Sequence, residues 1–114
     1  MEDHQVCRLF ISNLRKDLKD NAAVDTLQQN TRWFWRNKVT QMMLREETIL
    51  SKYRPVLPAM IKKLKDDHED ILELLISIDH EPERFTLNSL ANLLEMHVIW
   101  EERELLPTLS NVKI

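Results

Sequence analysis

The stretch His97–Pro107, HVIWEERELLP, decides how this chain folds. If this stretch and the leucines before it form one helix, residues spaced three and four apart lie on the same face of that helix. The face formed in this way contains Leu90, Leu94, His97, Glu101 and Leu105. An imidazole and a carboxylate thus lie one turn apart on a leucine-lined face. Because a buried carboxylate without a partner is costly, this face requires either a metal ion or internal hydrogen bonds.

The composition is that of a single globular domain spanning residues 1–114. Apolar residues make up 43% of the chain and charged residues 31%, which is ordinary for a soluble protein and not for a disordered one. The net charge of -3 gives no electrostatic reason to expect binding to nucleic acid or to an acidic membrane. A chain of this length is enough to enclose one modest hydrophobic core.

The sequence also indicates a cytoplasmic setting. No run approaches the roughly 20 apolar residues that cross a membrane, and the N-terminal residues show no signal-peptide pattern. The single cysteine, Cys7, excludes an internal disulfide framework. We therefore expect no membrane association, and we expect Cys7 to be a small buried residue.

The positions of the turn-forming residues divide the chain into four helices. Glycine is absent, which disfavours tight hairpins and favours helices joined by simple turns. Asp20–Asn21 is suited to a break, Pro55 and Pro58 separate two helices, and Thr86 is suited to an N-cap. The amphipathic pattern predicts helices over about residues 3–19, 23–52, 57–77 and 87–106, the last ending at Pro107. Short connections between such helices predict an all-α, up-down-up-down antiparallel four-helix bundle.

Several polar side chains interrupt the predicted inward faces. They are His4, Lys38, Glu46, His68, His97 and Glu101. Bundles that bind metals do so by pointing imidazole and carboxylate groups inward, and this ligand type suits iron, manganese or zinc. No cysteine is expected near the cluster, which argues against a thiolate site. The glutamates next to Glu46 and Glu101 are expected to lie on a solvated face.

Hydrogen-bonded core residues are the alternative explanation for the same histidines. A single histidine on an apolar face is more often bonded within the core than bound to a metal. Three inward histidines accompanied by Glu46 and Glu101 make a metal site at least equally favoured. The residues alone leave these two possibilities open.

Four segments resemble one known family, the hemerythrin-like (HHE) cation-binding domain, and in particular its short bacterial single-domain members. The segments are EDHQVCRLF (2–10), FWRNKVTQMMLREETIL (34–50), KLKDDHEDI (63–71) and HVIWEERELLPTL (97–109). The resemblance covers nearly the whole chain, and the segments follow the order of the family's motifs. It implies a four-helix bundle around a carboxylate-bridged di-iron centre, associated with oxygen binding, redox sensing and iron handling.

The resemblance also implies a set of site residues. His4, His68 and His97 match imidazole ligands, and Glu46 and Glu101 match the bridging carboxylates. The chain departs from the family in the second helix, where Lys38 and Met42 stand at positions that are commonly histidine.

These departures predict an asymmetric site. His68 and His97 would serve one metal, whereas the other would keep only His4, since the thioether of Met42 is a weak ligand for iron. Lys38 is expected near the site or its mouth, where its ammonium could pair with the inward carboxylates.

The predicted function is therefore iron binding, with one or two ions at a partly degraded di-iron site that responds to oxygen, redox state or iron. The alternative is a metal-free bundle that serves as a protein-interaction module. An enzymatic role is less favoured, since the sequence shows no substrate pocket or dedicated nucleophile. The expected partners are a metal ion and dioxygen, with a homodimer or an unknown partner protein left open.

Overall fold

The computed structural model describes residues 2–112 and shows four long helical segments. The first is α1 (Glu2–Lys19) and the third is α4 (Pro58–His80). The second segment is composite: α2 (Val24–Phe34), the π-helical turn η1 (Trp35–Val39), α3 (Thr40–Leu50) and the 3-10 turn η2 (Ser51–Tyr53). The fourth is composite too: α5 (Arg84–Trp100), the π-helical turn η3 (Glu101–Leu105) and α6 (Leu106–Ser110).

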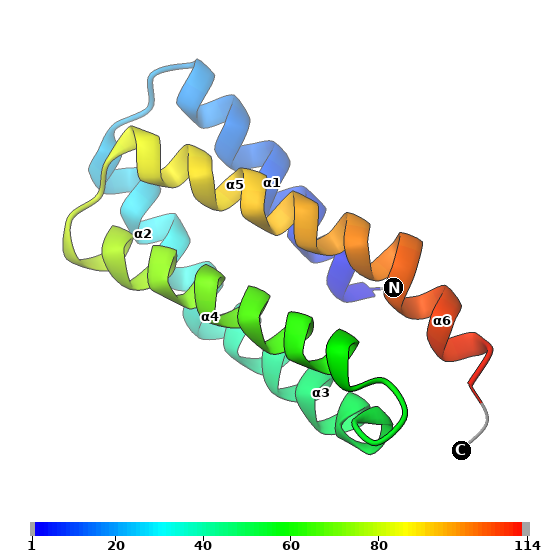
Figure 1. The fold of residues 1–114 in the computed structure, drawn as a ribbon. Coiled ribbons are helices and arrows are strands. Elements are labelled where there is room, and N and C mark those ends of the chain that lie inside the picture. Colours follow the sequence, from blue (N-terminus) through cyan, green and yellow to red (C-terminus); the bar gives the residue numbers. More distant parts are fainter. Residues whose placement is uncertain (1, 113–114) are drawn as a thin grey trace.

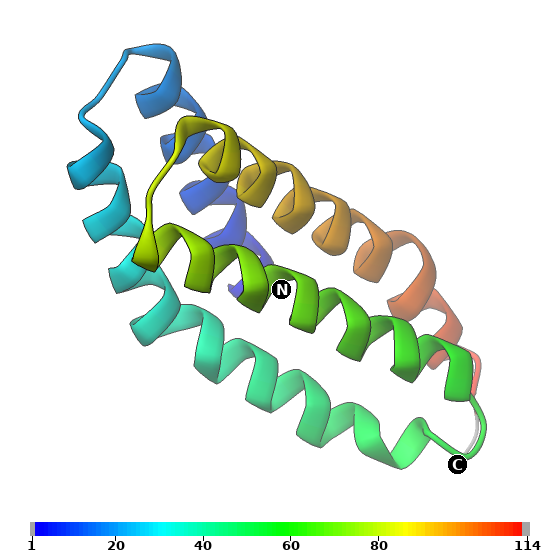
Figure 2. The same ribbon diagram turned by 60° about the vertical axis from the view of Figure 1, so that its left-hand side comes forward.

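The four segments form an elongated bundle measuring 49 × 22 × 21 Å. Consecutive segments run in opposite directions, and the same arrangement is visible in both ribbon views (Figures 1 and 2). Helix α5 packs against α1 on one side and α4 on the other, and α2 also packs against α4. The predicted all-α four-helix bundle is confirmed. None of the helices within residues 2–112 is long and apolar enough to cross a membrane.

The break after the first helix occurs where the sequence predicts it. Asn21 has a φ of 61°, in the left-handed region that asparagine tolerates better than most residues. The N–H of Ala22 donates to the carbonyl of Asp17, and the N–H of Asn21 donates to that of Leu18. This pair of bonds is a Schellman motif, which satisfies carbonyls left free at the end of a helix. In a chain without glycine, Asn21 takes over the role of the C-terminal cap.

The predicted boundaries between the third and fourth helices are wrong by three residues on each side. The third helix continues past residue 77 to His80, and the fourth begins at Arg84 rather than at residue 87. The reason is Pro82, because a proline holds the residue before it in an extended conformation. Glu81 accordingly ends α4 with φ −146° and ψ 96°. Glu83, not Thr86, occupies the N-cap position of α5.

Pro107 does not end the fourth segment. A proline inside a helix lacks an N–H and collides with the carbonyl four residues earlier. Here the turn before it is widened, and the N–H of Leu106 donates to the carbonyl of Glu101, five residues back. The π-helical turn η3 thus accommodates Pro107 in the first turn of α6.

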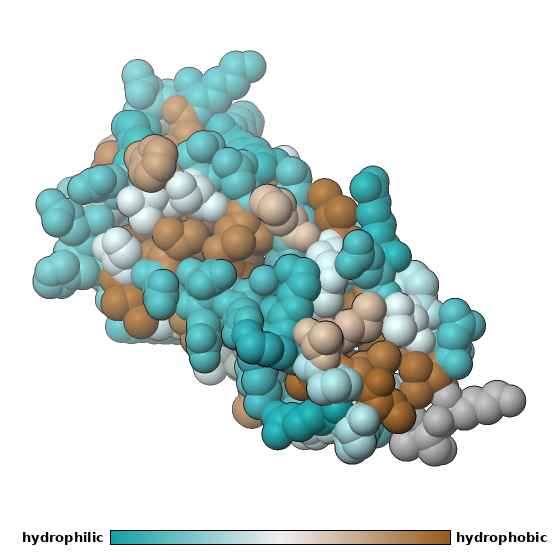
Figure 3. Space-filling view, in the orientation of Figure 1, coloured by the Kyte–Doolittle hydropathy of each residue, from teal (hydrophilic) through white to brown (hydrophobic). Residues whose placement is uncertain are grey.

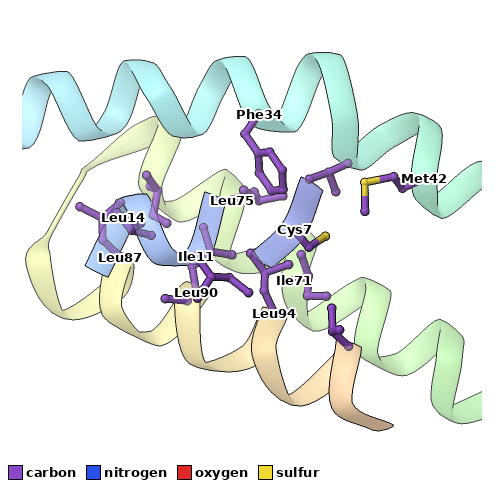
Figure 4. Packing of buried hydrophobic residues seen from close by; sticks show 14 of the residues in the cluster. Cys7, Ile11, Leu14, Phe34, Met42, Ile71, Leu75, Leu87, Leu90 and Leu94 are labelled. Atoms are coloured by element: carbon purple, nitrogen blue, oxygen red, sulfur yellow. The ribbon is translucent and has the colours of Figure 1, made fainter. Parts of the chain in front are cut away.

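The hydrophobic core consists of two clusters. The larger one includes Cys7, Phe34, Leu75 and Leu90, and Figure 4 shows its side chains converging from all four segments. Its aromatic pair, Phe10 and Phe34, is stacked with ring centroids 3.9 Å apart. The smaller cluster lies towards the other end of the bundle and contains Leu50, Ile61, Leu64, Trp100 and Leu105. On the outside, hydrophilic residues cover much of the face in Figure 3, with apolar residues visible along the junction of α4 and α5.

We predict that Leu75→Ala lowers the free energy of unfolding by about 2–5 kcal/mol, because Leu75 is 1% exposed within the larger cluster. Urea denaturation followed by circular dichroism measures this change. The matched control is Leu44→Ala, at a leucine that is 67% exposed, which should change the free energy by less than about 0.5 kcal/mol. Equal effects of the two substitutions would contradict this description of the core.

Candidate metal centre

Five polar residues predicted to face inward meet between the two hydrophobic clusters. They come from every segment of the bundle: His4 from α1, Glu46 from α3, His68 from α4, His97 from α5 and Glu101 from η3. Along α4, for example, His68 lies between Leu64 of the smaller cluster and Ile71 of the larger one. The three histidines and Glu101 are buried, and Glu46 is half-buried. A layer of ionisable groups therefore crosses the middle of the core.

The inner faces of the imidazoles point at the two carboxylates. Nε2 of His68 lies 2.9 Å from Oε2 of Glu46, and Nε2 of His97 lies 3.7 Å from the same oxygen. Glu101 lies between two histidines, with its Oε1 2.8 Å from Nε2 of His97 and 3.6 Å from Nε2 of His4. Ligand atoms of Glu46, His68 and His97 are all within 4.8 Å of one another, which is compact enough to surround a single ion. His4 lies outside this group, and its Nε2 is 3.6 Å from the oxygen of Glu101 that also faces His97.

These groups line a cavity of about 20 Å³. This volume has room for one water molecule or one small ion, but not for an organic substrate. The rest of the wall consists of apolar and sulfur-containing side chains: Cys7, Val39, Met42, Met43, Ile71, Leu94 and Val98. The cavity is thus small, apolar or sulfur-lined on most sides and polar only where the imidazoles and carboxylates converge.

Two of the three imidazoles have an inner nitrogen without a hydrogen-bond partner. Nε2 of His4 and Nε2 of His97 are buried and make no hydrogen bond with residues 2–112. Buried polar atoms in proteins are almost always satisfied, so an unpaired one requires an explanation. An imidazole nitrogen that makes no hydrogen bond and is aimed at a cavity beside two carboxylates becomes, once a cation displaces its proton, the donor that the cation needs. The residues therefore fit a metal ion.

The outer nitrogen of each histidine is held by a second carboxylate. Nδ1 of His4 hydrogen-bonds to Oε2 of Glu102 at 3.0 Å. The corresponding bonds are 2.9 Å from Nδ1 of His68 to Glu47 and 3.0 Å from Nδ1 of His97 to Asp67. A carboxylate can only accept, so Nδ1 carries the proton in each case. This arrangement fixes the ring orientation and leaves Nε2 as the inward ligand atom, as in most metal-binding histidines.

These outer carboxylates are functional residues that the sequence reasoning missed. Glu47 and Glu102 were expected on a solvated face, and both are indeed half-exposed, yet each reaches a buried imidazole. Surface cations in turn hold two of the three: Arg8 donates to Glu102, and Lys63 donates to Asp67. The sequence did contain a signal for these acids: each one directly follows or precedes a residue predicted to lie in the site.

The carboxylates control the protonation of the histidines. Burial alone would lower the pKa of His97, but Glu101, Glu46 and Asp67 together outweigh it and raise that pKa to about 10. Burial likewise opposes Glu46 and Glu47 at His68, whose pKa is nevertheless raised. At His4, Glu101 and Glu102 raise the pKa against the effect of burial.

The histidines have the reciprocal effect on the carboxylates. Burial would raise the pKa of Glu101, but His4 and His97 reverse this and lower it to about 2. Arg8 lowers the pKa of Glu102 to about 2 against the opposing effect of desolvation, and His4 adds to the lowering.

The two residues expected to replace ligands lie in different places. Met42 is buried on the cavity wall, as its position one turn before Glu46 implies. Lys38 does not lie at the site. Its Nζ is 5.9 Å from the ring centroid of Trp33, and it borders a separate groove between α1 and α2. The reason is that Lys38 precedes Glu46 by eight residues, about 12 Å of helical rise, and itself lies in the π-helical turn η1, which departs from regular helix periodicity.

The expectation that no cysteine lies near the cluster is wrong. Cys7 is 3% exposed and lines the same cavity as His4 and Glu101. Burial, followed by the nearby charges of Glu46 and Glu101, raises the pKa of its thiol to about 12. Without a cation in the cavity, Cys7 is therefore a neutral thiol.

We predict that the metal-free protein is most stable between about pH 4.5 and pH 6.5. The raised pKa of His97 gives a contribution that is complete below 6.5 and is lost as the pH rises towards 10. The lowered pKa values of Glu101 and Glu102 give a contribution that is present above 4.5 and is lost as the pH falls towards 2. Denaturant titrations in the presence of a chelator measure this profile.

The control for this pH profile is a histidine outside the cluster. His97→Gln should flatten the alkaline side, whereas substitution of the exposed His80 should leave it unchanged. Stability that stays constant from pH 6.5 to about 10 would contradict the assignment.

Comparison with known proteins identifies the family of this chain. The chain showed no significant match to a curated protein or to a solved structure. Residues 1–109 of the 114-residue chain match the family model described as the hemerythrin HHE cation-binding domain. The chain belongs to the hemerythrin HHE cation-binding domain family.

Proposed function

We propose that this protein binds iron within its bundle and responds to oxygen, redox state or iron supply. The main position is formed by Glu46, His68, His97 and Glu101, and His4 contributes to a weaker second position. The observation that carries this proposal is the pairing of each imidazole. All three Nδ1 atoms are held by carboxylates, while Nε2 of His4 and Nε2 of His97 are buried beside Glu101 and make no hydrogen bond within residues 2–112. Iron bound there would supply reversible redox and dioxygen chemistry.

The main position is also balanced in charge. Glu46 and Glu101 provide two negative charges, which offset one divalent cation in a region where an unpaired charge is costly. The protein's own contribution is to fix the ligands and to exclude water, since the remaining wall is apolar or sulfur-lined. A cavity of about 20 Å³ has no room for an organic substrate. We therefore propose a binding protein rather than an enzyme, working in the cytoplasm.

The first test is the iron content of protein loaded anaerobically with ferrous iron. We expect about one firmly bound iron per chain and, at free iron 100 times the dissociation constant, about 2.7 kcal/mol of added stability. Glu101→Gln should abolish both, because it removes one of the two buried negative charges. Glu104→Gln is the matched control, at an exposed glutamate of the same π-helical turn, and should bind iron as the unmodified protein does.

The other outcomes of this test are equally informative. Two irons per chain with oxo-bridge absorption would contradict the asymmetry inferred from Met42. Binding that is unaffected by Glu101→Gln would contradict the ligand assignment.

The second test concerns the outer carboxylates. Asp67→Asn should weaken iron binding about 10- to 100-fold, because it disturbs the carboxylate that orients His97 without removing a ligand. Asp66→Asn is the matched control, since Asp66 is exposed and pairs with Lys62. Isothermal titration measures both affinities. Equal affinities for the two variants would show that Asp67 does not position the imidazole.

A second candidate function is a metal-free bundle that binds a partner protein, and one observation favours its metal-free interior. Both ring nitrogens of His68 hydrogen-bond to carboxylates, at 2.9 Å to Glu46 and 2.9 Å to Glu47. Since both nitrogens must then donate, His68 is an imidazolium ion and can compensate Glu46 without a metal. Absence of iron binding under all loading conditions would support this candidate.

A further inference from the structure

We propose that the groove between α1 and α2 is a dimer interface, which the same groove of a second copy of this chain covers. In this two-fold dimer, Lys38 of each protomer pairs with Asp17 of the other. The proposal goes beyond the proposed function, and it does not depend on whether iron is bound.

The groove exists because two neighbouring helices are loosely packed. Helix α1 packs closely against α5 but much less closely against α2. The hollow between α1 and α2 has a volume of about 460 Å³, and the buried side chains of Leu14, Leu27 and Phe34 form its floor. Thr31 is also buried there, but its hydroxyl already donates to the carbonyl of Leu27 at 2.8 Å. The floor is therefore apolar, and covering it removes apolar surface from water, which is favourable.

Large apolar side chains stand on the rim of the same groove. Leu9 of α1 is 63% exposed and Trp33 of α2 is 58% exposed, and both line the hollow. A two-fold interface requires a hollow and protruding side chains on one surface, because the same patch must contact itself. In the dimer, Trp33 of one protomer enters the groove of the other. Tryptophan is among the residues most enriched at the centres of protein interfaces.

The two ends of the groove carry opposite charges. Helices α1 and α2 run antiparallel, and the stacked rings of Phe10 and Phe34 mark the level at which they pass each other. Lys38 lies about one turn beyond Phe34, and Asp17 lies about two turns beyond Phe10 in the opposite direction. About 16 Å of helical rise therefore separates the two charged residues. Neither of them makes an ion pair with residues 3–112.

A two-fold axis brings these two charges together. Rotation by 180° about an axis through the middle of the groove, roughly perpendicular to the helices, places the Lys38 end of one protomer against the Asp17 end of the other. The dimer then contains two such pairs. Nζ of Lys38 lies 5.9 Å from the ring centroid of Trp33, so the charge and the aromatic ring enter the interface together. A partner of different sequence would need both charges in matching places, whereas a second copy has them by symmetry.

The bundle offers enough surface for this contact. One long side measures 49 × 22 Å, and specific interfaces bury roughly 800 Å² on each partner. Two neighbouring helical segments form each long side, so a contact centred on the α1–α2 groove can reach this size.

The experiment measures the association state of the full chain by sedimentation velocity over a range of concentrations. We expect a monomer–dimer equilibrium whose dissociation constant rises at least about tenfold in Lys38→Asp and in Asp17→Lys, because each variant places two pairs of like charges across the interface. An equimolar mixture of the two variants should dimerise as the unmodified chain does, since every pair in the mixed dimer again joins opposite charges. Lys65→Asp is the matched control, at a half-buried lysine of α4, and should dimerise normally.

Trp33→Ser tests the apolar part of the interface independently of charge. It should also raise the dissociation constant at least about tenfold, because it removes a large ring from the centre of the contact. Phe85→Ser is the matched control, at an aromatic residue of α5 that is 79% exposed, and should leave the dissociation constant unchanged. Circular dichroism identifies a variant that fails to fold, and the remaining variants then test the same groove.

Three results would overturn the proposal. They are a chain that stays monomeric up to about 1 mM, a dimer that all three groove variants leave unchanged, and a mixture of Lys38→Asp with Asp17→Lys that fails to recover. Iron content separates this proposal from the main one, because Lys38, Asp17 and Trp33 do not line the metal cavity and their variants should bind iron normally. Normal iron binding by a monomeric chain removes only the dimer, whereas loss of iron binding by the unmodified chain removes the proposed function.

Discussion

The burial of two carboxylates among three imidazoles is the constraint on which this bundle depends. A charge in an apolar interior is tolerated only when an opposite charge or a bound ion compensates it. The chain satisfies this requirement in successive layers. Glu46 and Glu101 face the imidazoles, a second set of carboxylates holds the outer ring nitrogens, and Arg8 and Lys63 hold two of those carboxylates at the surface. The layer formed by Glu46, Glu101 and the three imidazoles also divides the hydrophobic core into two clusters.

Local helix geometry is adjusted next to this layer. Each π-helical turn is adjacent to it in sequence: η1 ends at Val39 on the cavity wall, and η3 begins at Glu101. Such wide turns insert an extra residue into a helix and are frequent at functional sites. In η3 the same turn also accommodates Pro107. One deviation from regular geometry thus allows a buried glutamate and a proline to lie six residues apart in one continuous segment.

The sequence predicted the bundle and the meeting of its inward polar residues, because both follow from the spacing of apolar positions along regular helices. It failed where regular geometry fails. The position of Lys38 was extrapolated through a π-helical turn that the amphipathic pattern does not reveal. The end of the third helix and the start of the fourth were misplaced because they depend on the conformation that Pro82 imposes on Glu81.

The outer carboxylates were missed because periodicity only separates inward from outward positions. It does not identify a half-exposed acid whose side chain reaches a buried imidazole. Cys7 was predicted on the same stripe as His4, so the information that places it at the cavity was already present in the sequence.

The inward residues span the chain from position 4 to position 101, and each helical segment contributes at least one of them. An ion held among them would be a reversible cross-link between segments that are distant along the chain. Closing loops of this length in an unfolded chain has a large entropic cost, which a bound ion would offset only while every contributing helix stays docked. Its release would then loosen the first and last segments together. Loss of one ion at the centre of the bundle would thus affect both ends of the chain at once.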